Sequence, residues 1–119
     1  MTQLVVGFEV EGKHGWPNAP KEYSDFANSH RHLFKFICWY EVSGWYDKSV
    51  DNTDPARRDK ELFELRRELV SYLDEFIGAD GIADFGNMSC EGLADFLKSQ
   101  DKRLAKVYAG EEWFLGALV

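Results

Sequence analysis

Cysteine is scarce in this sequence, because only Cys38 and Cys90 occur among its 119 residues. Two cysteines are too few for a disulfide scaffold, so we expect reduced thiols and a cytoplasmic protein. Long apolar runs are also missing, since none approaches the ~20 residues that a membrane-spanning helix needs. Residues 1–10 contain Glu9 and lack the basic start of a signal peptide. We therefore expect a protein without a membrane-spanning helix and without a secretion signal.

Positive charge is in deficit as well. Fourteen Lys and Arg stand against 21 Asp and Glu, which gives a formal net charge of −7 at pH 7. A protein that coats nucleic acid needs a basic field along the phosphates, so the composition argues against that class. A small anion in a local arginine-lined pocket stays compatible with this charge, because net charge describes the whole surface and not one site.

Aromatic side chains, by contrast, are abundant, with nine Phe, five Tyr and four Trp. So many large rings require a buried core, which excludes an intrinsically disordered chain. The length matches one domain, so we assign residues 1–119 to a single domain.

The order of the hydrophobic patterns predicts an α+β fold. Alternating apolar residues indicate strands, and leucines spaced three and four apart indicate helices. The predicted elements, in chain order, are strand 4–10, loop 11–20, short helix 21–29, strand 32–42, helix 55–77, loop 79–87, helix 90–99, strand 103–108 and strand 113–119. Thr53 or Asp54 is expected to cap the first long helix. The β-β-α-α-β-β order implies an antiparallel sheet with two helices packed on one face.

Strand 32–42 is apolar on both of its faces. One face would carry Phe34, Phe36, Cys38 and Tyr40, and the other Leu33, Ile37 and Trp39. The helices would cover only one of them. Because the second face would be exposed in a single chain, we expect an oligomer.

The three histidines are candidate metal ligands. His30 and His32 are two residues apart at the start of a strand, so both side chains point the same way. His14, just past the first strand, could complete a three-histidine site with an open position, as in catalytic zinc. Local hydrogen bonding of the three imidazoles is the alternative, and the spacing leaves both open.

Other candidates lie in loops and at a helix start. Glu111, placed in the turn before the last strand, could accept two N–H bonds from the edge of a guanine or pterin, or be a solvated acid. Asn87 precedes Ser89, the predicted cap of the second helix, whose N-terminus favours an anion such as phosphate. Trp16 suits stacking on a flat base or packing onto the core. Cys90, in the first turn of that helix, could have a lowered pKa, although no histidine neighbours it in sequence.

This arrangement resembles the tunnelling-fold family of pyruvoyl- and carboxy-tetrahydropterin synthases. The resemblance rests on the element order and on His14, His30 and His32, which it implies to be zinc ligands, with Glu111 anchoring the pterin. Phe26 stands where that family has its nucleophilic cysteine, and no histidine remains to act as general base. The resemblance therefore implies a related pocket without the synthase machinery.

The sequence resembles a second family more closely in its motifs, the phage Thoeris anti-defence sponge family. This resemblance rests on the stretches Phe8–Pro20, His30–Phe34, Leu65–Glu68 and Asn87–Glu91, and more loosely on Gly110–Val119. The run Val10-Glu11-Gly12-x-His14-x-Trp16-Pro17-x-Ala19-Pro20 is the most specific part. The family implies a hexamer that sequesters cyclic ADP-ribose-type signals without chemistry, and some members also hold cyclic oligonucleotides.

The leading interpretation is therefore a phage-encoded sponge for a small cyclic nucleotide, acting in the host cytoplasm without a cofactor. Its expected ligand-binding residues, at a subunit interface, are Trp16 and Phe85 as apolar walls, Asn87 and Ser89 as polar contacts, Arg31 and Arg57 on the pyrophosphate, and Glu111 on the base or a ribose hydroxyl. The first alternative is a zinc-dependent tunnelling-fold enzyme with metal on the three histidines. The second is an oligomeric module whose apolar sheet face binds a protein.

Overall fold

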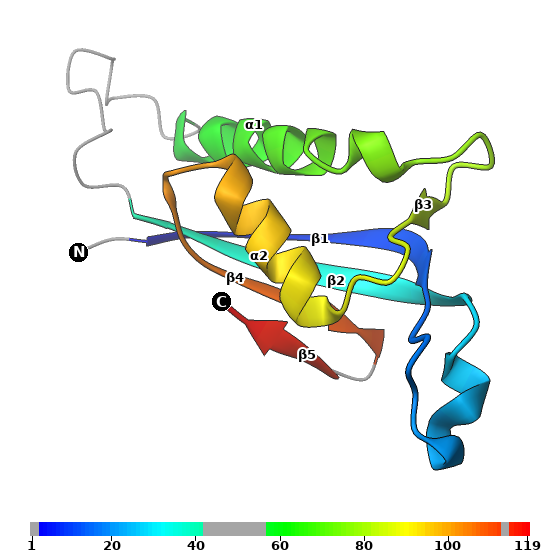
Figure 1. The fold of residues 1–119 in the computed structure, drawn as a ribbon. Coiled ribbons are helices and arrows are strands. Elements are labelled where there is room, and N and C mark those ends of the chain that lie inside the picture. Colours follow the sequence, from blue (N-terminus) through cyan, green and yellow to red (C-terminus); the bar gives the residue numbers. More distant parts are fainter. Residues whose placement is uncertain (1–2, 42–56, 113–114) are drawn as a thin grey trace.

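The computed structural model describes residues 3–41, 57–112 and 115–119, and the side chains of residues 57–60 lie outside this description. Its strands are β1 (Gln3–His14), β2 (His30–Glu41), β3 (Ala83–Asp84), β4 (Leu104–Glu111) and β5 (Leu115–Leu118). Its helices are α1 (Arg57–Ser71) and α2 (Cys90–Gln100), with short 3-10 helices η1 (Lys21–Phe26) and η2 (Asp74–Phe76). The fold is thus α+β, as predicted (Figure 1).

The five strands form one sheet in the order β3-β1-β2-β4-β5 (Figure 1). The pairs β1–β2, β2–β4 and β4–β5 are antiparallel, as expected. The sheet is mixed, and not antiparallel throughout, because the two-residue strand β3, which the sequence did not predict, pairs parallel with β1. This strand lies inside segment 79–87, whose glycines and aspartates indicated only a loop.

The long pair of β1 and β2 lies inside the sheet and follows the predicted alternation. Val6 pairs with Cys38 and Phe8 with Phe36. On β2, the residues Phe34, Phe36, Cys38 and Tyr40 are at most 1% exposed. The intervening residues are only half buried, because successive strand residues point to opposite faces.

Both helices pack on this same face of the sheet, which confirms the predicted layers (Figure 1). α1 packs on β1, and α2 packs on β4 and β5. Leu65 and Leu69 from α1 join Leu93 and Leu97 from α2 and the buried face of β2 in one hydrophobic core. Each of these leucines is at most 3% exposed, so the leucine spacing correctly identified the core-facing sides.

Several strand ends differ from the prediction. β1 continues to His14 and β2 begins at His30, because the antiparallel ladder extends to the pair of these two residues. Residues 11–14 are therefore strand, not loop. β4 likewise extends to Glu111, so this glutamate ends a strand and does not sit in a turn.

The predicted helix 55–77 is shorter than expected at its C-terminal end. α1 ends at Ser71, and a turn at Leu73 leads into η2, after which Ile77 is extended. Leu73 remains 1% exposed because the turn keeps this side chain directed at the core. The expected capping residues 53–55 lie outside the described residues.

The opposite face of the sheet is covered by neither helix. Val5 is 52% exposed, and Ile37 and Trp39 are half buried, as predicted for a single chain. The Nζ of Lys106 lies 5.0 Å from the centre of the Trp39 ring and shields part of it. The oligomer inferred from this face stays a prediction. None of the helices in the described ranges has the length and apolar character needed to cross a membrane.

Candidate functional site

Three histidines and one glutamate meet at the end of the sheet where β1 stops and β2 begins. His14 pairs with His30, and Gly12 pairs with His32, so the three imidazoles lie on the helix-covered face. Glu111 reaches the same face from the end of β4. One candidate ligand atom from each of the four residues lies within 4.8 Å of the others. The sequence placed His30 and His32 on one face and left open whether His14 joins them; the structure brings all three together, and Glu111 with them.

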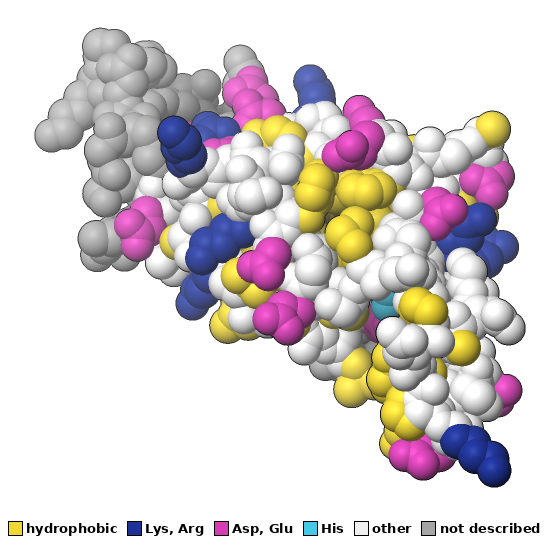
Figure 2. Space-filling model, viewed as in Figure 1, with side chains coloured by type: hydrophobic (Ala, Val, Ile, Leu, Met, Phe, Trp, Pro, Cys, Tyr) yellow, Lys and Arg dark blue, Asp and Glu magenta, His cyan; other side chains and the backbone are white. Residues whose placement is uncertain are grey.

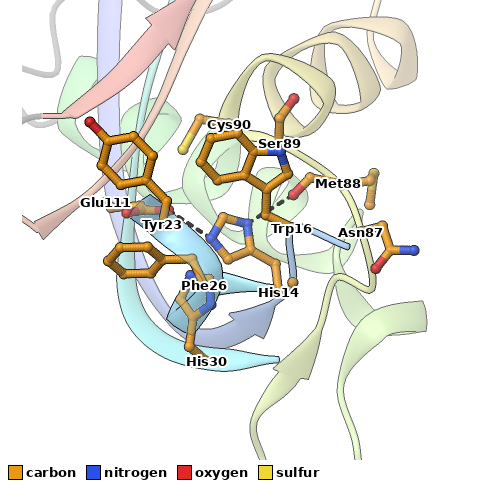
Figure 3. A pocket seen from close by; sticks show the side chains of 11 residues that line it. His14, Trp16, Tyr23, Phe26, His30, Asn87, Met88, Ser89, Cys90 and Glu111 are labelled. Atoms are coloured by element: carbon orange, nitrogen blue, oxygen red, sulfur yellow. Dashed lines mark hydrogen bonds and ion pairs between the residues drawn. The ribbon is translucent and has the colours of Figure 1, made fainter. Parts of the chain in front are cut away.

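His14 links the members of this His–Glu cluster (Figure 3). Its Nε2 lies 2.6 Å from Oε1 of Glu111, and its Nδ1 lies 2.9 Å from the carbonyl oxygen of Met88. Its ring also meets those of His30 and His32 edge-on, at centroid distances of 4.7 and 5.7 Å. The residue is 8% exposed, so both ring nitrogens are fixed in place by the fold.

The other two histidines differ in their partners. Nδ1 of His30 lies 3.1 Å from the carbonyl oxygen of Asn28. Nε2 of His32 lies 3.4 Å from Oε2 of Glu111, yet this buried nitrogen makes no hydrogen bond to any residue in the described part of the chain. A buried polar atom without a hydrogen bond is unfavourable, so this nitrogen is available to a cation.

The residues of the cluster fit the zinc ion that the tunnelling-fold resemblance implies. Imidazole nitrogens and a carboxylate oxygen are common zinc donors in proteins. Backbone carbonyls next to Nδ1 of His14 and His30 leave Nε2 of each ring for a metal, which is how proteins commonly orient histidine ligands.

A pocket of about 360 Å³ opens beside the cluster (Figure 3). Its lining residues are His14, Gly15, Trp16, Tyr23, Phe26, His30, Asn87, Met88, Ser89, Cys90 and Glu111. The rings of Trp16 and Tyr23 stack at a centroid distance of 6.0 Å, and Phe26 meets His30 edge-on at 5.4 Å. Histidine atoms reach the surface next to hydrophobic and acidic side chains at this end of the molecule (Figure 2). The pocket thus combines aromatic walls with a polar base.

Four of the seven predicted ligand-binding residues line this pocket: Trp16, Asn87, Ser89 and Glu111. Ser89 also caps α2 as predicted, because its Oγ accepts a hydrogen bond from the Gly92 N–H at 3.1 Å. Helix-start and loop positions were therefore useful guides to the site.

The remaining three predicted residues are not among the lining residues of the single chain. Arg31 points to the opposite side of the sheet from His30 and His32 and pairs with Glu11. Phe85 is 2% exposed and packs against Gly12, where a Cβ atom would come within 2.7 Å of the Phe85 ring. Arg57 begins α1, and its side chain lies outside the described residues.

Sequence reasoning missed Tyr23, Phe26 and Met88 as pocket residues. The available signal was the spacing of Tyr23 and Phe26, three apart in the expected short helix. The lowered pKa that a helix-start position could give Cys90 is not found: burial, and then the charge of Glu111, raise the pKa of this thiol to about 11. The thiol is therefore protonated at neutral pH.

No protein-family model matches this chain, and no curated protein matches it. The geometry of the site is therefore the guide to function. That geometry combines a pocket lined by aromatic side chains with a cluster of imidazole and carboxylate groups.

Proposed function

We propose that the protein is a sponge that binds a small cyclic nucleotide of the cyclic ADP-ribose type and withholds it without degrading it. The observation that carries this proposal is the pocket bounded by Trp16, Tyr23 and Phe26. Aromatic side chains at a concave surface suit stacking on a purine base. A volume of about 360 Å³ is also in the range of small-molecule sites.

The other part of the pocket suits the phosphates of such a ligand. Asn87 and Ser89 line it beside the first turn of α2. A helix N-terminus carries partial positive charge, and an asparagine amide supplies N–H donors. These local groups can hold a small anion although the protein has a net charge of −7.

The side chains that line the pocket support binding without turnover. Cys90 is a weak nucleophile at neutral pH because its pKa is about 11. Phe26 lines the pocket and stands, by the tunnelling-fold resemblance, where a nucleophilic cysteine would be. The proposal includes the hexamer that the anti-defence resemblance implies and a site of action in the cytoplasm of a phage-infected host.

Isothermal titration with cyclic ADP-ribose isomers, cyclic dinucleotides and cyclic trinucleotides tests the proposal, with native mass spectrometry to count subunits. We expect tight binding of at least one compound, recovered with unchanged mass after the protein is denatured. Trp16→Ala should weaken binding about 5- to 150-fold, because stacking on one base contributes about 1–3 kcal/mol.

Phe63→Ala is the matched control, since Phe63 is a 61% exposed aromatic residue of α1 outside the pocket. This variant should bind the ligand like the wild type. Absence of binding to every compound, or release of a chemically altered ligand, would contradict the sponge.

The convergence of His14, His30 and His32 with Glu111 favours a second candidate, a zinc-dependent tunnelling-fold enzyme acting on a pterin precursor. A zinc ion there would polarise a substrate carbonyl or hydroxyl. Turnover of a pterin substrate by zinc-loaded protein, lost in His30→Ala, would favour this enzyme over the sponge.

A further inference from the structure

We propose that Glu111 is the fourth protein ligand of a closed divalent-metal site formed with His14, His30 and His32. The tunnelling-fold resemblance implies three histidine ligands, with the glutamate turned to the bound ring. The geometry of this chain places the glutamate among the imidazoles instead. The inference does not depend on the proposed nucleotide, because it concerns the cluster and not the aromatic walls of the pocket.

The hydrogen-bond partners of His14 require a proton or a metal ion between His14 and Glu111. A backbone carbonyl only accepts, so the Nδ1 that lies 2.9 Å from the Met88 oxygen carries a hydrogen. In the neutral ring, Nε2 then presents a lone pair to a carboxylate oxygen 2.6 Å away. Two acceptors at this distance repel each other unless a cation, or a hydrogen on one of them, lies between them.

The other two histidines favour a metal ion over a proton. A proton would satisfy one pair, that of His14 with one oxygen of Glu111. It would leave Nε2 of His32 buried, without a hydrogen bond, 3.4 Å from the other oxygen. Nδ1 of His30 is held by a carbonyl, which makes its Nε2 a lone-pair atom as well. One divalent cation can bind Nε2 of all three rings, with His32 in the tautomer that leaves Nε2 unprotonated, together with a Glu111 oxygen.

The donor set indicates the class of metal. Three nitrogens with one oxygen suit zinc and similar borderline ions, whereas magnesium and calcium prefer oxygen ligands. Zinc lies about 2.0–2.2 Å from such donors, so ligand atoms around one tetrahedral ion are ~3–4 Å apart. The four atoms already lie within 4.8 Å of one another, so small side-chain rotations suffice.

A carboxylate in the fourth position changes what the metal can do. Catalytic zinc keeps three protein ligands and leaves the fourth position to water or substrate, whereas structural zinc is fully ligated by protein. A fully ligated ion here would connect the ends of β1, β2 and β4. Such an ion would stabilise the fold next to the pocket. It would have no free coordination position at which to react with a ligand in the pocket.

Zinc binding to the chelator-treated full chain is the first test. We expect one zinc per chain by elemental analysis and a matching titration. Glu111→Gln should lower the zinc affinity at least about 100-fold, because losing even an outer partner of a ligand costs about 10–100-fold. Glu91→Gln, which removes an exposed carboxylate in the first turn of α2, should bind zinc like the wild type.

Cobalt substitution then tests whether the site is closed. Four-coordinate Co²⁺ absorbs strongly in the visible range, and azide changes that spectrum only where it can take a coordination position. We expect the wild-type spectrum to be strong and insensitive to azide, and the spectrum of Glu111→Ala to respond to it. The wild-type measurement needs no variant, so it holds even if a substitution impairs folding.

Two results would overturn the inference. Failure of the wild type to bind zinc would mean that a proton occupies the cluster, and an azide-sensitive wild-type spectrum would mean that Glu111 is not a ligand. Trp16→Ala separates this inference from the proposed function, because it should lose nucleotide affinity and retain the metal.

Discussion

Along one face of β2, two stretches of the same strand have different surroundings. Phe34 and Phe36 are at most 1% exposed and pack in the core that both helices join. His32 and His30 continue the same face, but there they meet Glu111 and the aromatic pocket. The strand therefore sets the direction of each side chain, and the covering elements decide whether that direction leads into a core or into a site.

The largest expected difference between the two stretches is in stability. Phe36→Ala should lower the free energy of unfolding by about 3–5 kcal/mol, because it leaves a cavity in a closely packed core. His32→Ala in metal-free protein should cost only about 1 kcal/mol, since its side chain is 21% exposed. Denaturant unfolding measures both. Equal losses would show that the cluster is packed as tightly as the core.

Two carboxylates of the molecule have different partners. Glu111 lies next to His14 and His32, whereas Asp101, at the C-terminal end of α2, lies next to an arginine. Asp101 is 8% exposed; its Oδ2 lies 2.7 Å from Nη2 of Arg103, and it accepts a further bond from the Tyr72 hydroxyl. The hydrogen bonds from Arg103 lower the pKa of Asp101. Because the folded-state pKa lies below the unfolded value of about 3.9, its stabilisation is present above that pH and is lost as the pH falls further.

Asp101→Asn should therefore cost about 2 kcal/mol at pH 7 and make stability less dependent on pH below about 4. Thermal unfolding of both proteins between pH 2.5 and 7 measures this. If the variant lost stability below about pH 4 as steeply as the wild type, the pH dependence would come from other carboxylates. Nucleotide and zinc binding at pH 7 should be unaffected, in contrast to substitutions of Glu111.

Arg31→Ala should have the smallest effect. Arg31 lies between His30 and His32 in sequence, but its side chain is on the other face of the sheet. Its ion pair with Glu11 is exposed, and such pairs contribute about 0–1 kcal/mol. Stability and zinc affinity should both stay close to wild type in denaturant unfolding and zinc titration. A large loss of nucleotide affinity would instead place Arg31 at a ligand site completed by another subunit.

Much of the fold could be predicted from local pattern. Alternation along 32–42 identified the buried face of β2, and the leucine spacing identified the core-facing sides of α1 and α2. The ends of β1 and β4 were predicted too short because Glu11, Gly12 and Gly110 have low strand propensity, and the pairing with β2 overrides it. β3 was missed because two residues carry no periodicity.

The candidate site was predicted in part. Spacing in a strand placed His30 and His32 on one face, and Trp16, Asn87 and Ser89 were found as loop and helix-start positions. Tyr23 and Phe26 were missed because they lie in the connection between β1 and β2. Only the folding of this connection in the tertiary structure brings them beside His14. The raised pKa of Cys90 was missed because it depends on burial, which a helix-start position does not reveal.

The sequence by itself determined the α+β class, the two layers, the direction of the paired histidines and the cap of α2, because these follow from the periodicity and chemistry of nearby residues. Only the tertiary structure decided that Glu111 joins His14 and that aromatic side chains enclose a pocket beside them. Those contacts depend on the register of β1, β2 and β4, which pairs residues far apart in the chain and is set by packing of the whole sheet.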